Sequence, residues 1–278
     1  MATNFSGSTS EFARVGSGVV LKYPRAVPQE TRAYEDIAKN FAVEIQILKL
    51  LRHPRIVKLV FRCWRRFTPT DDLHRYLGEN KPQGDPRGIL LAEANRGDLQ
   101  RYLDEHWNEI TPWVRNSWCL QVVESVAYIH ARGVIHSDIR PENFLVHEKK
   151  PGDPELWLCD FGGSTCDKLG LDGGHLPDPG FFDPRSDWTS TPNTDIFSVG
   201  SVLYSILTGH WPYREAGPFA SAEERDDYGV KVDELFGQGQ FPDVDELFAG
   251  KVILKCWNNE YTTAEDLVVD VRNCMQDS

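Results

Sequence analysis

The chain has 278 residues, a formal net charge of −12 and a composition of 40% hydrophobic and 26% charged residues. This length suits one large domain or two small ones, with a core that needs no disulfide or metal for support. The composition excludes a disordered, collagen-like or coiled-coil chain. The excess of acid argues against nucleic acid or an anionic membrane surface as the main partner.

The cysteines and the apolar stretches indicate the cellular compartment. The six cysteines are scattered and form no Cys-x-x-Cys pair, which favours reduced thiols in a cytoplasmic or nuclear protein. The first residues have neither a basic region nor an apolar run, so no signal peptide is expected there. The most apolar stretch, 196–207, contains three serines and a glycine and is too short to span a membrane.

The first third of the chain predicts short strands and one helix. Apolar residues recur at helical spacing over 31–51, and Pro54 ends that pattern. Residues 65–88 are polar, charged and rich in Pro and Gly, which predicts a loop or insertion. Short apolar runs bounded by turn residues predict strands at four places: 11–15, 18–22, 56–61 and 89–91.

The remainder of the chain has a mostly helical pattern. Helical spacing begins at Leu99, and one long loop rich in Gly and Pro, 162–184, interrupts it. A strand-rich first third followed by a helix-rich remainder predicts an α+β protein with two lobes.

Four short motifs carry residues suited to chemistry. Asp138 and Asn143 stand five residues apart in the sequence HSDIRPENFLV. An aspartate can accept a proton from a hydroxyl, and an asparagine oxygen can bind a hard cation such as Mg²⁺. A second carboxylate, Asp160, follows an apolar run and precedes two glycines. Upstream, Lys22 ends a β-branched run, and Glu44 lies on the helical stretch.

In this order, the motifs resemble the signature set of the eukaryotic protein kinase family, of the Ser/Thr type. The run ending at Lys22 resembles the family's V-A-I-K, HSDIRPEN resembles its catalytic loop, and 160–162 is its D-F-G. The stretches that begin at Asp195 and Cys256 resemble the family's helix F and its last helices. In a minimal domain, the set also resembles kinase-like proteins of filamentous fungi.

The resemblance covers nearly the whole chain, so one kinase domain over 1–278 is expected. It implies a bilobal α+β fold with a small N-lobe, about 1–93, that holds an antiparallel β-sheet and one long helix. The C-lobe, about 94–278, is expected to be larger and mainly helical. The implied activity is transfer of the γ-phosphate of ATP to a Ser or Thr hydroxyl of a protein substrate, with Mg²⁺ as cofactor.

The catalytic residues follow from the same resemblance. Lys22 would hold the α- and β-phosphates and pair with Glu44. Asp138 would orient and deprotonate the acceptor hydroxyl. Arg140 replaces the catalytic-loop lysine that contacts the γ-phosphate, and this exchange alters length and shape although the charge is kept.

Further residues are implied for metal, nucleotide and internal support. Asn143 and Asp160 would hold Mg²⁺. His136, Phe161 and Leu48 would stack as an internal spine, with Asp195 anchoring the catalytic loop. Either Ala92 or Glu93 takes the usual hinge Glu position. The remaining nucleotide contacts are expected from the glycine turn, the first strands, the hinge and the strand after the catalytic loop: Gly7, Phe12, Val20, Leu91, Glu93, Asp98 and Leu145.

Two departures from the family concern the nucleotide and the activation loop. The glycine-rich turn retains only Gly7, because Phe5 and Ser10 occupy its other glycine positions, and we expect a weaker grip on phosphates. Ser137 replaces the arginine that meets an activation-loop phosphate. A serine cannot pair with a phosphate bidentately, so activity is expected to need no phosphorylation within 163–183.

A third departure concerns the ion pair that clamps the activation segment to the C-lobe in the family. Arg185 and Tyr261 replace its Glu and its Arg, so no Glu–Arg clamp is expected. Arg185 should reach solvent or pair with Asp183 or Asp187, at a cost below about 1 kcal/mol on truncation. Tyr261 should pack in the C-lobe.

Other functions compete with the enzyme. The glycine-poor turn and the altered substrate side are also consistent with a pseudokinase that acts as a nucleotide-binding or protein-interaction module. A small-molecule phosphotransferase on a related fold is a third hypothesis. The enzyme is favoured because a binding module has no need to keep five residues: Lys22, Glu44, Asp138, Asn143 and Asp160. The basic cluster at Arg62, Arg65 and Arg66 is interpreted as a solvated edge.

Overall fold

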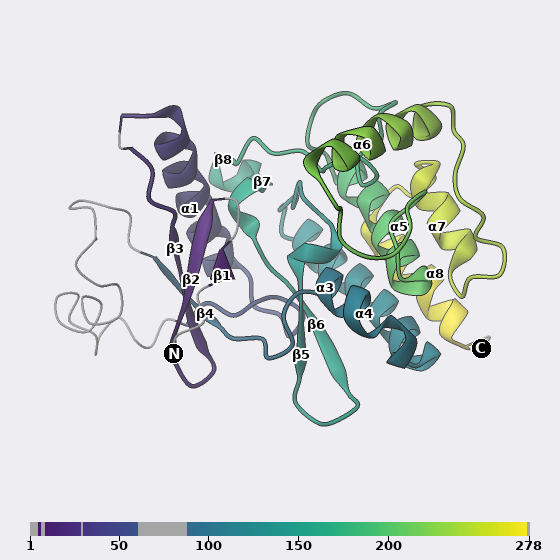
Figure 1. Cartoon of the computed structure of the whole chain (residues 1–278), viewed down its shortest axis with the longest axis horizontal. Coiled ribbons are helices and arrows are strands. Elements are labelled where there is room, and N and C mark those ends of the chain that lie inside the picture. The colour runs from purple at the N-terminus through teal and green to yellow at the C-terminus, as the bar shows by residue number, and fades with distance from the viewer. Residues whose placement is uncertain (1–4, 7–8, 29, 61–87, 277–278) are drawn as a thin grey trace.

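The computed structural model describes residues 5–6, 9–28, 30–60 and 88–276. Its first part contains an antiparallel four-stranded sheet in the order β1-β2-β3-β4. The sheet consists of β1 (Phe5–Ser6), β2 (Ser10–Gly16), β3 (Val19–Pro24) and β4 (Ile89–Ala92). One long helix, α1 (Arg32–Leu50), lies beside this sheet and completes the N-lobe (Figure 1).

Local signals set the bounds of α1. The Thr31 side chain caps the first turn by accepting a hydrogen bond from the backbone of Tyr34. The helix ends at Leu50, because Leu51 is already extended and Pro54 follows. Its buried face carries apolar residues and Glu44, so the helix brings one carboxylate into the interior.

The second part is mainly helical and forms the larger lobe (Figure 1). Its helix α5 is the centre of this lobe, because Thr194 to Ile206 are all buried. At Gly200 a Cβ atom would lie 2.8 Å from Cys256, so glycine is required for the close packing of α5 on α7. The helices are α3 (Leu99–His106), α4 (Pro112–His130), α5 (Pro192–Thr208), α6 (Ala222–Gly237), α7 (Gly250–Trp257) and α8 (Ala264–Gln276).

Short strands and 3-10 turns connect α4 to α5. These are η3 (Pro141–Asn143), β5 (Phe144–Glu148), β6 (Pro154–Leu158), η4 (Phe161–Gly163), β7 (Thr165–Cys166), η5 (Asp167–Leu169) and β8 (Leu171–Asp172). A further turn, η2 (Trp107–Glu109), links α3 to α4. The hairpin β5–β6 places the catalytic loop before it and D-F-G after it.

The bilobal α+β fold is therefore confirmed, and the helix expected over 31–51 agrees with α1 to within one residue at each end. The strand expected over 56–61 was wrong in extent. Ile56 bridges Leu158, whereas Leu59 bridges Leu91, so this segment changes partners and forms no continuous ladder. The basic cluster and the insertion expected over 65–88, apart from Gly88, lie outside the described residues.

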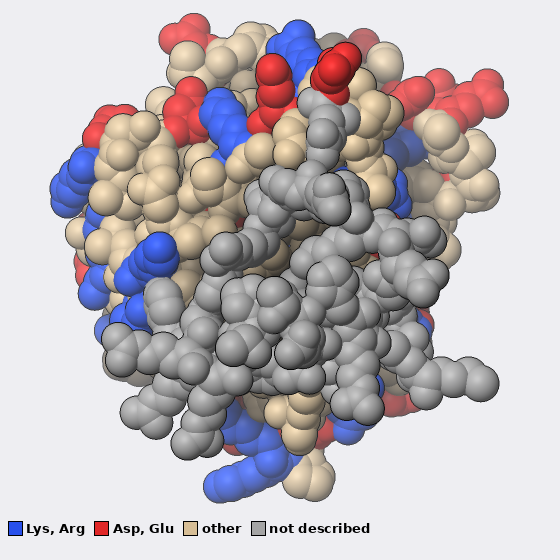
Figure 2. Space-filling model, turned by 90° about the vertical axis from the view of Figure 1, so that its left-hand side faces the viewer, with Lys and Arg blue, Asp and Glu red and all other residues tan. Residues whose placement is uncertain are grey.

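Two observations concern the surface and the membrane. On the face shown in Figure 2, the described acidic and basic side chains are interspersed. Among the residues that the structure describes, no helix has the length and apolarity needed to cross a membrane.

Candidate active site

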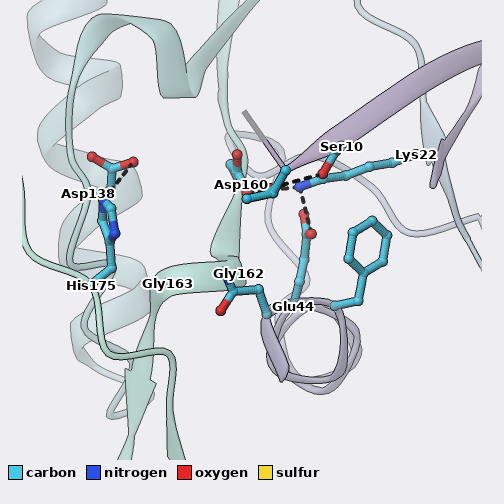
Figure 3. Close-up of a pocket in the computed structure, with 11 residues that line it drawn as sticks. Ser10, Lys22, Glu44, Asp138, Asp160, Gly162, Gly163 and His175 are labelled. Atoms are coloured by element: carbon cyan, nitrogen blue, oxygen red, sulfur yellow. Dashed lines mark hydrogen bonds and ion pairs between the residues drawn. The ribbon is translucent and has the colours of Figure 1, made fainter. Parts of the chain in front are cut away.

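Lys22, on β3, lies between two carboxylates that come from other parts of the chain. Its Nζ lies 2.7 Å from Oε2 of Glu44 on α1 and 2.8 Å from Oδ1 of Asp160, which follows β6. Lys22 and Glu44 are almost wholly buried, whereas the Asp160 side chain is half-exposed. Figure 3 shows both contacts from the lysine. The triad is therefore accessible to solvent at Asp160.

Burial and charge set the ionisation of the triad. Burial alone would lower the pKa of Lys22, but Asp160 and Glu44 beside the ammonium raise it above its usual value. Burial raises the pKa of Glu44 despite the neighbouring ammonium. Desolvation alone would also raise the pKa of Asp160, but Lys22 holds it below its usual value. Lys22 and Asp160 therefore carry opposite charges at neutral pH.

Asp195 on α5 fixes the backbone of the catalytic loop. Its Oδ2 accepts from the His136 N–H at 2.7 Å, and its Oδ1 accepts from the Ser137 N–H at 2.9 Å. His130 Nε2 lies 2.8 Å from the same Oδ2. Ser137 has a φ of +68°, a left-handed conformation that costs a side-chain-bearing residue energy and must be held by its surroundings. The expected anchoring role of Asp195 is confirmed.

Asp138 and Asn143 are adjacent at the open end of this loop. Nδ2 of Asn143 donates to the Asp138 carbonyl at 2.7 Å and to its carboxylate Oδ2 at 2.8 Å. The amide nitrogen is thereby committed to Asp138, which leaves the Asn143 side-chain oxygen for another partner. The geometry places a carboxylate and a side-chain amide oxygen side by side.

The D-F-G segment is fixed by an aromatic contact and a backbone turn. His136 and Phe161 pack edge to face, with ring centroids 4.9 Å apart. His136 Nε2 is also hydrogen-bonded to the Cys159 carbonyl at 2.9 Å. Asp160 has a φ of +62°, so the chain turns sharply there. Leu48, the third expected spine residue, is buried in the same core.

A pocket lies between these groups and includes residues that the sequence did not single out. It is lined by Ser10, Lys22, Glu44, Asp138 and Asp160, among others. His175 also lines it, with its Nε2 3.7 Å from Asp138 Oδ2 (Figure 3). His175 comes from the loop over 162–184, which has no periodicity or motif to mark it.

The residues predicted to contact the nucleotide lie mainly on the strands β2, β3, β4 and β5. Val20 pairs with Leu91 across β3 and β4, and Phe12 pairs with Lys22 across β2 and β3. Asp98 forms a backbone bridge with Leu145. The Phe12, Val20 and Leu145 side chains are half-buried, and Leu91 is buried. Gly7 lies outside the described residues.

Two of the residues predicted to contact the nucleotide have local partners in the protein. The Asp98 side chain caps α3 by accepting from the Arg101 N–H at 2.9 Å. The Glu93 N–H donates to the Gly18 carbonyl at 2.9 Å, and the Glu93 carboxylate pairs with Arg14. Ala92 is still within β4. The hinge side chains are thus held by protein contacts.

The oxygen donors fit a magnesium ion. Mg²⁺ takes hard oxygen ligands and is bound through one or two protein side chains together with substrate phosphates and water. The half-exposed Asp160 carboxylate and the free side-chain oxygen of Asn143 provide two such ligands.

The substitute for the family's clamp is an internal pair. Arg185 donates to Asp183 from Nε at 2.7 Å and from Nη2 at 3.1 Å, and also to the Trp257 carbonyl. Asp183 is only 3% exposed and accepts a further bond from Asn259 at 2.7 Å. Tyr261 is buried, and its hydroxyl donates to Asp270. The expected Arg185–Asp183 pair and the packing of Tyr261 are confirmed.

Sequence comparison agrees with this geometry. The family model described as the protein kinase domain matches residues 16–234. This match covers more than half of the chain, so the chain belongs to the protein kinase family.

Individual relatives are distant and longer. The human mitogen-activated protein kinase kinase kinase 7 is 29% identical over 192 residues, which cover 66% of this chain and 27% of that protein. The serine/threonine-protein kinase PkaA of Streptomyces coelicolor is 28% identical over 203 residues, which cover 71% of this chain and 33% of that protein. The serine/threonine-protein kinase WNK of Caenorhabditis elegans is 26% identical over 248 residues, which cover 87% of this chain and 12% of that protein. The chain thus spans a third or less of these relatives.

Proposed function

We propose that this protein is an active Ser/Thr protein kinase that transfers the γ-phosphate of ATP to a protein hydroxyl and depends on Mg²⁺. The observation that carries the proposal is that Lys22, Glu44, Asp160 and Asp138 line one pocket. Lys22 lies between Glu44 and Asp160, and Asn143 is hydrogen-bonded to Asp138. The names of the curated relatives support the same reaction class.

Each charged group has a part in the proposed reaction. Lys22 binds the phosphates of ATP and is held in place by Glu44. Asn143 and Asp160 would hold the magnesium ion, which supplies neutralisation of phosphate charge. The acceptor oxygen bonds to the γ-phosphorus as the bond from that phosphorus to the ADP oxygen breaks, and the hydroxyl proton passes to Asp138.

A second candidate function, a nucleotide-binding pseudokinase, is favoured by one observation. Ser10 occupies a glycine position of the phosphate turn, is only 3% exposed and lines the pocket. A side chain at this position reduces the space through which backbone N–H groups approach a phosphate. This candidate predicts that the chain binds ATP but does not transfer phosphate.

The test compares wild type with Asp138→Asn. We expect the substitution to lower kcat by at least about a hundredfold, because general-base catalysis contributes about 10²–10⁴-fold. The affinity for Mg-ATP, measured by calorimetry, should be nearly unchanged. The matched control is Asp153→Asn in the exposed turn between β5 and β6, which should retain kcat. Equal turnover in Asp138→Asn would exclude the proposed role of Asp138.

A further inference from the structure

Arg140 lies in the catalytic loop, two residues after Asp138, and three carboxylates surround it. Its Nη1 donates to Asp178. Its Nε lies 3.8 Å from Asp138 and 3.8 Å from Glu142, and both distances are too long for a hydrogen bond. Asp178 is therefore the acid that fixes this guanidinium, although Asp138 and Glu142 are nearer in sequence.

The atoms left unpaired are consistent with this assignment. In the described part of the chain, Arg140 Nε, Asp138 Oδ1 and Glu142 Oε2 are buried without a hydrogen-bond partner. A buried guanidinium N–H next to two buried carboxylate oxygens would gain energy by moving onto either one. The bond from Asp178 opposes this movement and keeps Arg140 near Asp138 without contact.

Asp178 is itself anchored from two sides. Its carbonyl accepts from the Phe181 and Phe182 N–H groups at 3.0 and 3.2 Å, which fixes its backbone in a turn. Its carboxylate Oδ2, which binds Arg140, also accepts from Arg225 of α6 at 2.7 Å. One carboxylate thereby joins the catalytic loop, the activation segment (163–183) and α6.

The same turn packs closely on α6. Gly180 has a φ of +85°, and a Cβ atom there would lie 2.3 Å from the Tyr228 hydroxyl oxygen. Only glycine permits this approach. The position of Asp178 is therefore determined by the segment that carries it as well as by its two arginines.

We propose that Asp178 is a positioning residue for phosphoryl transfer: it holds Arg140 beside Asp138 but not bonded to it, and Arg225 links this arrangement to α6. The inference rests on the proposed function, together with the contact to the γ-phosphate that the kinase resemblance implies for Arg140. The charge of Asp178 is what matters, because a charge-assisted hydrogen bond is about twice as strong as a neutral one.

The first experiment is a double-mutant cycle in kcat with Asp178→Asn and Arg140→Ala. We expect Asp178→Asn to lower kcat about tenfold in wild type but less than about twofold in the Arg140→Ala background, since interacting residues are not additive. Asp167→Asn, an exposed acid of the same segment, is the matched control and should retain kcat. An equal tenfold loss in both backgrounds would overturn the proposal.

A conservative variant separates positioning from folding. Asp178→Glu keeps the carboxylate, so it should retain kcat within about threefold, whereas Asp178→Asn should not. Thermal unfolding monitors whether each variant is folded. If Asp178→Asn does not fold, Asp178→Glu still decides the question, because a tenfold loss in a folded Glu variant overturns the proposal.

A measurement without turnover distinguishes this inference from the proposed function. In ¹⁵N-arginine NMR, the guanidinium signal that disappears in Arg140→Ala belongs to Arg140. It should show restricted rotation in wild type and in Asp167→Asn, and free rotation in Asp178→Asn. Restricted rotation in Asp178→Asn would overturn the proposal even if the enzyme is active. If the wild type transfers no phosphate, the proposed function is overturned, and so is the role of Asp178 in phosphoryl transfer. The NMR result still decides whether Asp178 holds Arg140.

Discussion

Lys22 and Glu44 form an ion pair from which water is nearly excluded, with side chains only 4% and 1% exposed. Removing both charges from water costs energy, and the attraction between the two groups offsets that cost. Asp160 adds a second negative charge at 2.8 Å. The loss of one member therefore leaves a buried charge without compensation.

The first prediction concerns Lys22→Met. Near pH 8 the substitution should lower the free energy of unfolding by about 3–5 kcal/mol, because Glu44 becomes an unpaired buried charge. The loss should be smaller near about pH 5. Burial already raises the folded-state pKa of Glu44, and we expect the loss of Lys22 to raise this pKa further. Protonation of Glu44 therefore stabilises the folded variant at low pH. This stabilisation is lost as the pH rises through the folded-state pKa of Glu44. Urea unfolding at the two pH values is the measurement, and equal losses would contradict the account.

The stability cost expected for Arg185→Ala must be revised. A cost below about 1 kcal/mol applies to an exposed ion pair, but Asp183 is 3% exposed and depends on Arg185 for two hydrogen bonds from its side chain. Arg185→Ala should therefore cost about 2–3 kcal/mol, the penalty for a buried acceptor left poorly satisfied.

The control for Arg185 is Arg32→Ala, because Arg32 and Asp36 form an exposed pair with a separation of 3.9 Å. Denaturant unfolding should detect no change in this control. The double variant Arg185→Ala/Asp183→Ala should recover part of the stability that Arg185→Ala loses. A loss within 1 kcal/mol in Arg185→Ala itself would restore the original expectation.

At the scale of elements, the activation segment is held by its own backbone. The Gly173 N–H donates to the Ser164 carbonyl at 2.9 Å, and a Cβ atom at Gly173 would lie 2.3 Å from Gly163. Ser164 is fully buried and donates to the His136 carbonyl. Ser137, where the family has its arginine, bonds instead to Ser190. The segment is thus ordered by a backbone hydrogen bond and by an unmodified serine side chain.

This arrangement predicts that activity needs no phosphorylation within 163–183. Phosphatase treatment should leave the rate of peptide phosphorylation unchanged, because position 137 is a serine and provides no arginine to bind a phosphate. Mass spectrometry before and after treatment verifies that any phosphate was removed. A loss of more than about tenfold on removal would show that a modified residue in this segment supports activity.

The sequence predicted elements well where local signals mark their ends. Thr31 and Pro54 bracket α1, so its limits were correct to one residue. The strand over 56–61 was predicted less well, because its pattern does not reveal that Ile56 and Leu59 bond to different partners. Loop 162–184 offered no periodicity, so its path could not be predicted.

At the scale of the whole molecule, the order of motifs predicted the core of the candidate site. Lys22 and Asp160 are 138 residues apart in sequence, yet the family pattern placed them together, and they form an ion pair. His175 and the pair Asp178–Arg225 were not predicted. Their positions depend on how the activation segment packs against the catalytic loop and α6, and sequence spacing does not encode that packing.

The activity of the whole chain is tested most directly by mixing it with Mg-ATP and a peptide library, then measuring ADP release and the phosphorylated sites by mass spectrometry. The account predicts one phosphorylated Ser or Thr for each ADP released above the peptide-free background, and almost none with Asp138→Asn. Binding of ATP without any phosphorylated peptide or autophosphorylated chain would contradict it and support the pseudokinase instead.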